Sequence, residues 1–418
     1  MYRSLRVVAG SALAGLFVAT ALIGCAAPPS HHTATVSPRG TTVMPSAGTS
    51  SPKVAPQGAS ASASATPSSA SSPALSWSLV SSPNPPGNTF TSLNGVACGG
   101  EFCWAVGEVT TAYAQALLEQ YNGSAWSIVS SPVPSGSASS VLSGVTCLAQ
   151  TDCWAVGDFT DSGGTAHPLI EQYTGSQWTL VTAPSPSQGG SLFAVTCVTA
   201  GECWAVGGVF GGSAPLVELY SGSSWSIVSS PALAGMTQAD QSLNGVACLS
   251  ATECWAVYLG VDSYILEFTD GAWSTVPIAD PSDVSLKGVA CSSGTCWAVG
   301  LAGSDDTVIE TNSGGGWQTV AAPAPSDDVL MSVACVDATD CWADGYVLPG
   351  NPAGSGGVST LIEQHDGGGW AVASSPDPTS AWGDEFSSIT CVSVSACWAV
   401  GTQDDGPGSG ETLIVQGS

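Results

Sequence analysis

From Leu75 to the C-terminus, apolar residues recur in short runs separated by glycine, serine, asparagine and proline. In the first stretch these runs cover residues 93–98, 103–107, 117–121 and 126–129. Short runs rich in valine, isoleucine, tryptophan and tyrosine and bounded by turn residues are typical of β-strands. No segment has a sustained period of 3.6 residues, so the pattern predicts an all-β region almost without helix.

The same four runs return along the chain, and the second run, Cys-Trp-Ala-Val-Gly, marks each repeat unit most clearly. It is found first at Cys103, and close copies begin at Cys153, Cys203, Cys254, Cys296, Cys341 and Cys397. A further cysteine precedes each copy, and successive preceding cysteines are 49, 50, 51, 43, 44 and 56 residues apart. Four strands in about 50 residues, repeated seven times, predict a seven-bladed β-propeller with four antiparallel strands per blade.

The two ends of the repeat region complement each other. Six units have a fourth strand that opens with a tryptophan: Trp126, Trp178, Trp225, Trp273, Trp317 and Trp370. The seventh unit stops after residues 413–416, whereas a strand of the missing type, residues 77–83, precedes the first unit. We therefore expect this N-terminal strand to complete the last blade and close the ring, which leaves no long free edge.

The order of these elements resembles kelch repeats and the central domain of galactose oxidase. In those families a strand ends in Gly-Gly, a tyrosine ends the third strand and a tryptophan opens the fourth, as at Gly207-Gly208, Tyr220 and Trp225. Most units here lack the second glycine. The turns before Trp317 and Trp370 are similar to the Asp-box of sialidase-type propellers, without its Ser-x-Asp core. The cysteine-paired pattern GVxC…CWAVG…LIEQY…W resembles secreted repeat proteins of Gram-positive bacteria. These resemblances cover residues 75–418.

The repeat region holds fourteen cysteines, two in each unit, separated by four or five residues at the end of one strand and the start of the next. A short hairpin places such cysteines opposite each other, within reach of a disulfide. The predicted disulfides are Cys98–Cys103, Cys147–Cys153, Cys197–Cys203, Cys248–Cys254, Cys291–Cys296, Cys335–Cys341 and Cys391–Cys397. A zinc site needs four ligands, and seven pairs spread around a ring stay apart, so disulfides are favoured over metal binding.

Residues 1–25 have the pattern of an export signal, with Arg3 and Arg6 before an apolar run. The run ends in Leu22-Ile23-Gly24-Cys25, which resembles the lipobox of bacterial lipoproteins. That resemblance implies lipid attachment at Cys25 and a place on the extracellular face of the cell membrane. The alternative is an ordinary secretory signal cut near Ala26. Residues 26–74 are rich in serine, alanine, proline and threonine and are expected to be a disordered linker before the propeller of residues 75–418.

The charge of the repeat region is strongly negative. All 32 acidic residues follow Leu75, and Lys287 is the one lysine or arginine after that position. The repeat region therefore has a formal charge of −31. Such a surface repels phosphate backbones, so no nucleic-acid partner is expected, and the only expected membrane contact is the lipid anchor. In one interpretation the acidic residues keep the protein soluble. In the other they bind calcium or a basic partner.

The connections between second and third strands, and from each fourth strand into the next unit, vary in length and content. In an up-and-down sheet these loops emerge on the same face, which is the expected binding surface. The candidate residues on that face are Asp158, Asp161, His167, Tyr258, Asp262, Tyr264, Asp305, Asp306, Asp344, Tyr346, Trp382, Asp384, Glu385, Asp404 and Asp405. A tryptophan beside carboxylates suits a sugar or a calcium-bridged ligand, and the alternative is a solvated acidic rim.

These observations predict a non-catalytic, lipid-anchored binding or scaffolding module with an extracellular protein or glycan ligand. The protein is expected to be a monomer. Calcium is the one cofactor that the sequence suggests, and no other cofactor is predicted. The alternative is an extracellular carbohydrate-active hydrolase or lyase that uses acidic residues of the same face. The sequence contains no arginine after Arg39 for a sialidase-type cluster, and no Ser-His-Asp motif. The glutamates repeated in the third strands (Glu119, Glu171, Glu218, Glu267, Glu310 and Glu363) are expected to be hydrogen-bonding scaffold residues.

Overall fold

The computed structural model describes residues 74–210, 212, 214–231, 242–259, 264–278, 284–303, 306–323, 328–349, 357–378, 383–406 and 409–418. The predicted signal segment with Cys25, and the linker up to residue 73, lie outside the described residues. Every regular element in these ranges is a β-strand, which confirms the all-β prediction. The described residues accordingly contain no helix long and apolar enough to cross a membrane.

In six of the repeat units, four consecutive strands pair as an antiparallel meander. The first unit consists of β2 (Phe90–Gly99), β3 (Phe102–Thr110), β4 (Ala114–Tyr121) and β5 (Trp126–Val129). The second consists of β6 (Ser137–Ala149), β7 (Asp152–Asp161), β8 (Ala166–Tyr173) and β9 (Trp178–Val181). The third consists of β10 (Gly190–Thr199), β11 (Glu202–Val209), β12 (Leu216–Tyr220) and β13 (Trp225–Ile227).

The later units follow the same plan. The fourth consists of β14 (Ser242–Ser250), β15 (Glu253–Leu259), β16 (Ile265–Thr269) and β17 (Ala272–Val276). The fifth consists of β18 (Val284–Ser292), β19 (Thr295–Ala302), β20 (Asp306–Asn312) and β21 (Gln318–Val320). The sixth consists of β22 (Asp328–Cys335), β23 (Asp340–Val347), β24 (Ser359–Asp366) and β25 (Trp370–Ala373). The seventh contributes β26 (Gly383–Ser393), β27 (Ala396–Gly406) and β28 (Ser409–Gly417).

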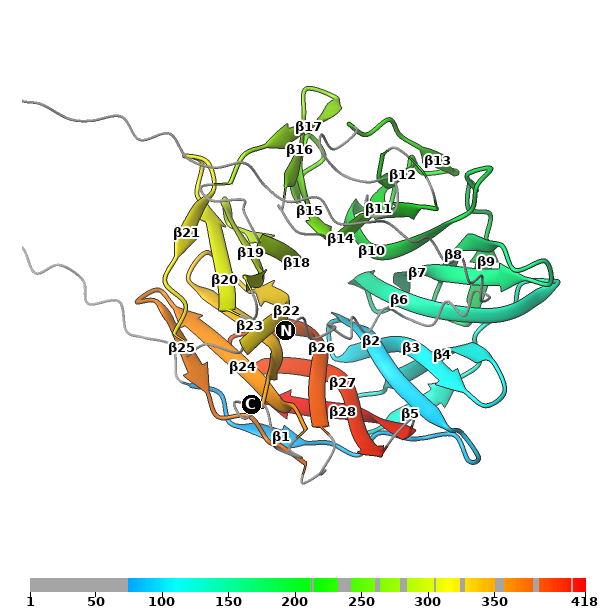
Figure 1. The fold of residues 1–418 in the computed structure, drawn as a ribbon, viewed down its shortest axis with the longest axis horizontal. Coiled ribbons are helices and arrows are strands. Elements are labelled where there is room, and N and C mark those ends of the chain that lie inside the picture. Colours follow the sequence, from blue (N-terminus) through cyan, green and yellow to red (C-terminus); the bar gives the residue numbers. More distant parts are fainter. Residues whose placement is uncertain are drawn as a thin grey trace, which may run out of the picture. The chain divides into compact units, whose positions relative to one another are not determined.

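The N-terminal strand completes the seventh unit, as predicted. β1 (Trp77–Leu79) pairs antiparallel with β28, with Trp77 opposite Gly417. The backbone N–H of Val80 extends the pairing by donating to the carbonyl oxygen of Ile414 at 2.9 Å. Figure 1 shows the blue β1 lying along the red β28. The sheet of the seventh unit therefore has the order β1-β28-β27-β26.

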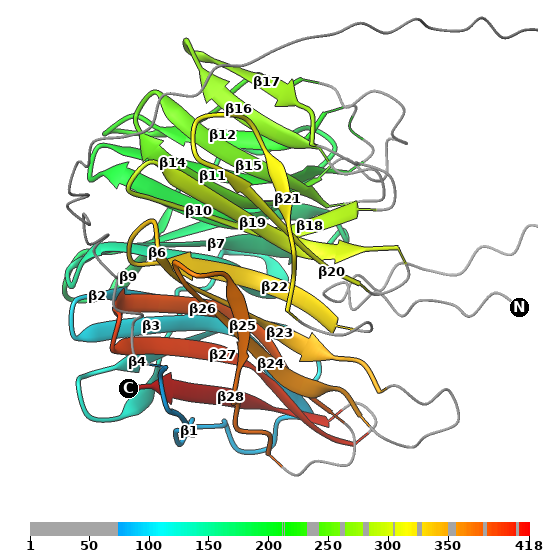
Figure 2. The same ribbon diagram turned by 90° about the vertical axis from the view of Figure 1, so that its left-hand side faces the viewer.

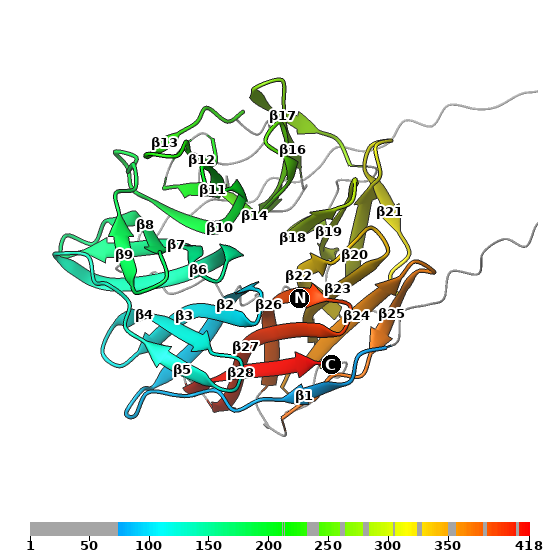
Figure 3. The same cartoon turned by 180° about the vertical axis from the view of Figure 1, so that it is seen from behind.

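The units follow one another around a common centre, with the first strand of each unit innermost (Figures 1 and 3). The inner strands contact each other in the order β2, β6, β10, β14, β18, β22 and β26, and β26 contacts β2 again. The third and fourth units are joined into one eight-stranded sheet through the single residue pair Gly208–Ser242. Figure 2 shows the strands from the side, running between two faces of this ring.

Each inner hairpin contains a β-bulge that brings its two strands very close together. In the first unit the bulge lies between Leu93 and Gly95, and Leu93 pairs with Gly107. A Cβ atom on Gly107 would lie 2.0 Å from the carbonyl oxygen of Ser92, so this close approach of the two backbones requires glycine. The fourth unit is the exception, with Tyr258 opposite Leu243 at the equivalent position. The glycine of the repeated Cys-Trp-Ala-Val-Gly run is thus explained by backbone packing and not by ligand binding.

The hydrophobic core lies between neighbouring units and is built from the repeated aromatic residues. Trp104 of the first unit packs against Tyr173 and Trp178 of the second, with ring centroids 4.8 Å and 5.0 Å apart. Edge-to-face arrangements of this kind stabilise aromatic pairs beyond simple burial. The equivalent contacts recur at Trp154, Trp204, Trp297 and Trp398.

The seven predicted disulfides are all present, and each joins the first two strands of one unit. Cys98 lies directly opposite Cys103 in the register of β2 and β3. Because every bridge closes its own hairpin, none of them links two units.

Candidate functional site

The two faces of the ring carry different connections. The turns within the first–second and third–fourth strand hairpins lie on one face, which we call the hairpin face. The second-to-third connections and the connections into the next unit lie on the other, the variable-loop face. The sequence predicts the ligand residues on the variable-loop face.

In the second unit, two predicted residues form a polar chain on that face. The Nε2 of His167 lies 3.0 Å from Oδ2 of Asp161, and its Nδ1 lies 3.0 Å from Oγ of Ser185. The hydrogen bond from His167 and the backbone N–H of Thr165 hold the pKa of the Asp161 carboxyl below its usual value. The side chains of Asp161 and His167 are about one third exposed, so this chain is accessible from solvent.

This polar chain borders a largely apolar cavity of about 320 Å³, which we call the His167 pocket. It lies between the start of β8 and the end of β9, with Phe159 and Pro134 in its wall. The Phe159 ring packs against the His167 imidazole with centroids 5.2 Å apart. A small apolar wall with one or two fixed polar groups is the usual composition of a ligand site.

Ser185 is not among the residues selected from the sequence, where no Ser-His-Asp motif is visible, and the structure adds it to this site. The three side chains are contributed by residues 161, 167 and 185, at spacings that match no known motif. The β8–β9 hairpin brings residue 185 back beside residue 167, and only this pairing creates the chain.

Glu108 of the first unit and Asp158 of the second unit lie close together, each near the C-terminal end of its second strand. Burial raises the pKa of Asp158 to about 6, against the opposing hydrogen bond from Ser191. Burial also raises the pKa of Glu108, and the nearby charge of Asp158 raises it further. Asp158 is therefore a half-buried group facing a second carboxyl.

Among the described residues predicted in the sixth and seventh units, Asp344 and Asp384 are buried, and Tyr346, Glu385 and Asp404 are half-buried. Asp344 has no exposed surface, and burial raises the pKa of its carboxyl well above the usual value. Asp384 is 1% exposed, whereas Tyr346 is half-buried. Burial, and then the charge of Asp404, raises the pKa of Glu385. Asp344 and Asp384 are thus not presented to solvent, contrary to their predicted place on an open loop surface.

In the fourth and fifth units, Tyr258 is also fully buried and packs against the half-buried Tyr264, with ring centroids 6.5 Å apart. Asp306 is exposed at the start of β20. The remaining candidates, Asp262, Asp305 and Trp382, lie outside the described residues, as does the side chain of Asp405. Within the described ranges, no three His, Cys, Asp or Glu side chains are placed to hold a metal ion. Calcium binding stays a prediction.

The repeated third-strand glutamates are buried scaffold residues, with one exception. Glu119, Glu171, Glu218 and Glu363 are each 0% exposed. Burial raises the pKa of Glu119 and of Glu218 to about 8, and that of Glu171 and of Glu363 to about 7. At neutral pH the carboxyls of Glu119 and Glu218 are therefore mostly protonated, and those of Glu171 and Glu363 are about half protonated. Ser82 donates a hydrogen bond to Glu119, and Ser131 donates one to Glu171.

Glu267 is the exception, because it is out of register with the other repeated glutamates. In the first unit Glu119 pairs with Ala105, the residue after the tryptophan. In the fourth unit Leu266 takes that position opposite Ala256, and Glu267 pairs with Trp255. A shift of one residue turns a side chain to the opposite face of its sheet. Glu267 therefore faces the fifth unit and is half-exposed.

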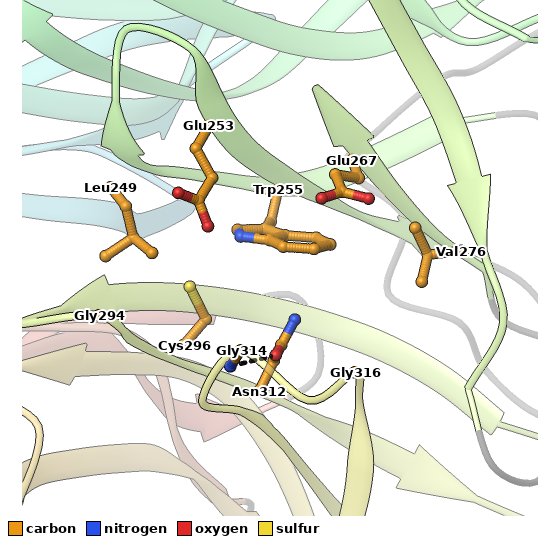
Figure 4. Close-up of a pocket in the computed structure, with 10 residues that line it drawn as sticks. All are labelled: Leu249, Glu253, Trp255, Glu267, Val276, Gly294, Cys296, Asn312, Gly314 and Gly316. Carbon is orange, nitrogen blue, oxygen red and sulfur yellow. Dashed lines mark hydrogen bonds between the residues drawn. The ribbon is translucent and has the colours of Figure 1, made fainter. Parts of the chain in front are cut away.

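Glu267 lines a cavity of about 470 Å³ between the fourth and fifth units, which we call the Trp255 pocket. It opens near the hairpin face, and its walls include Glu253, Trp255, Cys296 and Asn312. Figure 4 shows the two carboxylates on either side of the Trp255 indole, with Asn312 on the opposite wall.

The Trp255 pocket is not predicted from the sequence, because Glu267 is grouped there with the other third-strand glutamates as a scaffold residue. A signal was nevertheless available in the spacing of the third strand. Glu267 directly precedes the aromatic residue Phe268, whereas one residue separates Glu119 from Tyr121. This difference of one position is the register shift that turns Glu267 into the pocket.

The fold defines the class of protein. No protein-family model matches the chain, and no curated protein matches its sequence. Among solved structures, it is similar to the WD40 β-propeller domain of Doa1, with 11% identity and a TM-score of 0.53 over 82% of this chain and 97% of the other. It is also similar to YCF48 bound to D1 peptide, with 14% identity and a TM-score of 0.51 over 82% and 96%. YCF48 from Cyanidioschyzon merolae gives the same TM-score and identity, over 81% and 98%. The described region is therefore a β-propeller.

Proposed function

We propose that this β-propeller has seven blades, one per repeat unit, and acts as a non-catalytic, extracellular binding module. The continuous circle of inner-strand contacts and the pairing of β1 with β28 support a closed seven-bladed ring. The glycine, tyrosine and tryptophan positions of the repeat support a kelch-like unit. Binding takes place on the variable-loop face, with an extracellular protein or glycan as the ligand.

The His167 pocket is the observation that carries this proposal. In this part of the described chain, an accessible cavity coincides with two residues selected from the sequence, His167 and Asp161. Its apolar walls favour a ligand with a hydrophobic surface, and the His167 imidazole provides one oriented polar contact. The scaffold glycines and buried glutamates provide no comparable surface on that face.

Presentation at the cell surface is part of the same proposal. The export signal and the lipobox-like Cys25 support a lipid anchor, and the seven disulfides suit an oxidising compartment. Labelled fatty acid fed to expressing cells should be incorporated into the full-length protein and not into the Cys25→Ser variant. Equal labelling of both proteins would reject the anchor without affecting the binding proposal.

Binding is tested by probing glycan, peptidoglycan and peptide arrays with the wild-type protein, with and without calcium. Replacement of His167 by Gln should weaken the strongest signal by roughly tenfold, since it removes an oriented polar contact. The matched control is His365→Gln, because His365 lies at the hairpin face and contacts the carbonyl oxygen of Thr339 at 2.8 Å. Silence on all arrays, or equal loss in both variants, would contradict the proposal.

The Ser185–His167–Asp161 chain favours one alternative function, an extracellular hydrolase. In such an enzyme His167 would take the proton of the Ser185 hydroxyl, and Asp161 would orient the imidazole. The sequence-based alternative is an enzyme that uses acidic residues of the variable-loop face. Asp344 and Asp384 cannot serve as such acids, because both carboxyls are buried. Hydrolysis of an activated ester that is lost in Ser185→Ala and retained in the neighbouring Ser187→Ala variant would establish the hydrolase function.

A further inference from the structure

The Trp255 pocket arises from a departure of the fifth unit from the repeat. In most units the third-strand residue opposite the second cysteine is aromatic and covers the tryptophan of the preceding unit, as Tyr173 covers Trp104. In the fifth unit that position holds Asn312, and the ring contact of Trp255 within the described residues is the edge-to-face one with Trp317, at 5.4 Å. The space of an aromatic ring is thus left open beside Trp255.

The seventh unit shows that a missing aromatic residue need not leave a cavity. There Gly417 stands at the same position, and Leu75 and Trp77 fill the space, within 3.0 Å and 3.1 Å of the point where a Cβ would lie. Leu75 belongs to the core around Trp342. The fifth unit has no such replacement among the residues that line the pocket. The opening therefore coincides with the missing aromatic residue of the fifth unit.

Two carboxylates converge on the same opening. Glu267 is turned towards the fifth unit by its shifted register, and Glu253 lies on the same face of the sheet as Trp255. Burial raises the pKa of Glu267, and the neighbouring charge of Glu253 raises it further. None of the described residues that line the pocket is basic, so its two like charges face each other without a counter-ion from the wall. A bound cation would relieve this repulsion.

The side chain of Asn312 places a hydrogen-bond donor on the opposite wall. Its Oδ1 accepts a hydrogen bond from the backbone N–H of Gly314 at 2.9 Å, and Figure 4 shows the amide nitrogen pointing across the pocket towards Trp255. Asn312 is 7% exposed, so its amide is held in this orientation by the surrounding structure. A donor beside two acids suits a ligand that carries both a positive charge and an oxygen acceptor.

We propose that the Trp255 pocket binds a protonated primary amine in a molecule that also carries oxygen acceptors, as in an unacetylated amino sugar or a lysyl residue of a peptide. Glu253 and Glu267 act as counter-ions, the Trp255 indole forms the adjoining aromatic wall, and the Asn312 amide donates to a ligand oxygen. An organic cation is favoured over a metal ion, because only two carboxylates line the pocket and the rest of its wall is neutral. The site lies near the hairpin face and is independent of the function proposed above.

The test is calorimetric titration of the full-length protein with glucosamine and, separately, with Nα-acetyl-lysine amide. Their N-acetylated counterparts, N-acetylglucosamine and the Nε-acetylated lysine derivative, are the neutral controls. At least one of the two amines should bind, and its acetylated form should bind roughly tenfold more weakly or worse, because the charge-assisted hydrogen bonds are lost. The amine that binds more tightly identifies the source of the ligand.

Two kinds of variant connect binding to this pocket. Glu267→Gln and Glu253→Gln should each weaken amine binding by about tenfold. Glu202→Gln should leave it unchanged, since Glu202 stands at the position of Glu253 in the third unit. Asn312→Tyr restores the aromatic residue of the repeat, so it should abolish binding while the protein stays folded, with a thermal midpoint no lower than that of the wild type.

Four results would overturn the proposal. These are no binding of either amine, equal binding of amine and acetylated ligand, equal loss in Glu202→Gln, and retained binding in a folded Asn312→Tyr protein. The His167 variants should not alter amine binding, so failure here leaves the function proposed for the variable-loop face untouched.

Discussion

The buried third-strand glutamates show how a single neighbouring residue decides whether a carboxyl is satisfied. Ser131 donates a hydrogen bond to Oε1 of Glu171 at 2.7 Å, from the segment that leaves the preceding unit. Ala183 stands at the position of Ser131 in the next unit, and both carboxyl oxygens of Glu218 lack a hydrogen-bond partner among the described residues. An unsatisfied buried polar group costs about 1–3 kcal/mol of stability.

Replacement of Ala183 by Ser should therefore stabilise the protein by about 1 kcal/mol, because it supplies the missing donor to Glu218. Guanidinium unfolding of the wild type and the variant measures this difference. The gain should vanish when the Glu218→Leu substitution is present in both proteins. A gain that persists in the Glu218→Leu background would show that the hydroxyl acts elsewhere.

The raised pKa values of the same glutamates predict that stability falls as the pH rises. In the unfolded chain a glutamate ionises near a pH of about 4.3, whereas Glu218 in the folded protein has its pKa raised to about 8. The folded state binds more protons between these values, so the stabilisation is complete below a pH of about 4 and is lost progressively as the pH approaches about 8. Thermal unfolding at a pH of about 5 and at a pH of about 8.5 should show a higher midpoint at the lower pH.

Glu218→Gln isolates the contribution of one carboxyl, since the amide stays neutral at every pH. The variant should lose part of the difference in thermal midpoint between the two pH values. Glu202→Gln should keep the whole difference, because Glu202 lies near the surface. An unchanged pH dependence in Glu218→Gln would contradict the raised pKa.

At the scale of elements, the hairpin is the unit that the sequence specifies best. Cys147 and Cys153 flank a tight turn and lie opposite each other, and the bulge after Leu142 brings Gly157 close to the neighbouring strand. These features depend on residues close together in the chain, so local spacing is enough to predict them. The orientation of Glu267 was not predicted, because a shift of one residue inside β16 changes its face while the strand stays apolar.

Loss of one disulfide should destabilise its hairpin modestly and leave the fold intact. The bridge between Cys147 and Cys153 closes a loop with a sequence separation of 6, which corresponds to about 2 kcal/mol in the chain-entropy model. The double variant Cys147→Ser/Cys153→Ser should therefore unfold at lower guanidinium concentration with a native circular dichroism spectrum. Loss of that spectrum would mean that the bridge is needed to form the fold.

For the whole molecule, the decisive contact is the pairing of the first strand with the last. β1 covers the outer edge of β28, and Leu75 fills the core beside Trp342. No other described strand is free to pair with β28 in place of β1, because each is already paired within its own sheet. Closure therefore depends on residues from opposite ends of the propeller, among them Asn84, which accepts a hydrogen bond from the Thr412 backbone N–H at 3.0 Å.

Deletion of residues 1–80 should weaken the protein far more than deletion of residues 1–68. The longer deletion removes β1 and Leu75 and exposes the edge of β28, which promotes self-association. The shorter deletion leaves both in place. Size-exclusion chromatography and thermal unfolding should show a monomer with an unchanged midpoint for the shorter deletion, and aggregation with a lower midpoint for the longer one. Equal behaviour of the two proteins would show that β1 does not close the ring.

The sequence alone determined the strands, the disulfide pairs and the partner of the N-terminal strand, because each follows from a repeat with a visible period and a visible gap. The tertiary structure alone decided which departures from that repeat are accessible. Tyr258 and Asp344 became buried packing residues, while Ser185, Glu267 and Asn312 became part of pockets. The reason is physical: the repeat describes contacts within a unit, whereas burial and cavities depend on which side chain the next unit places opposite.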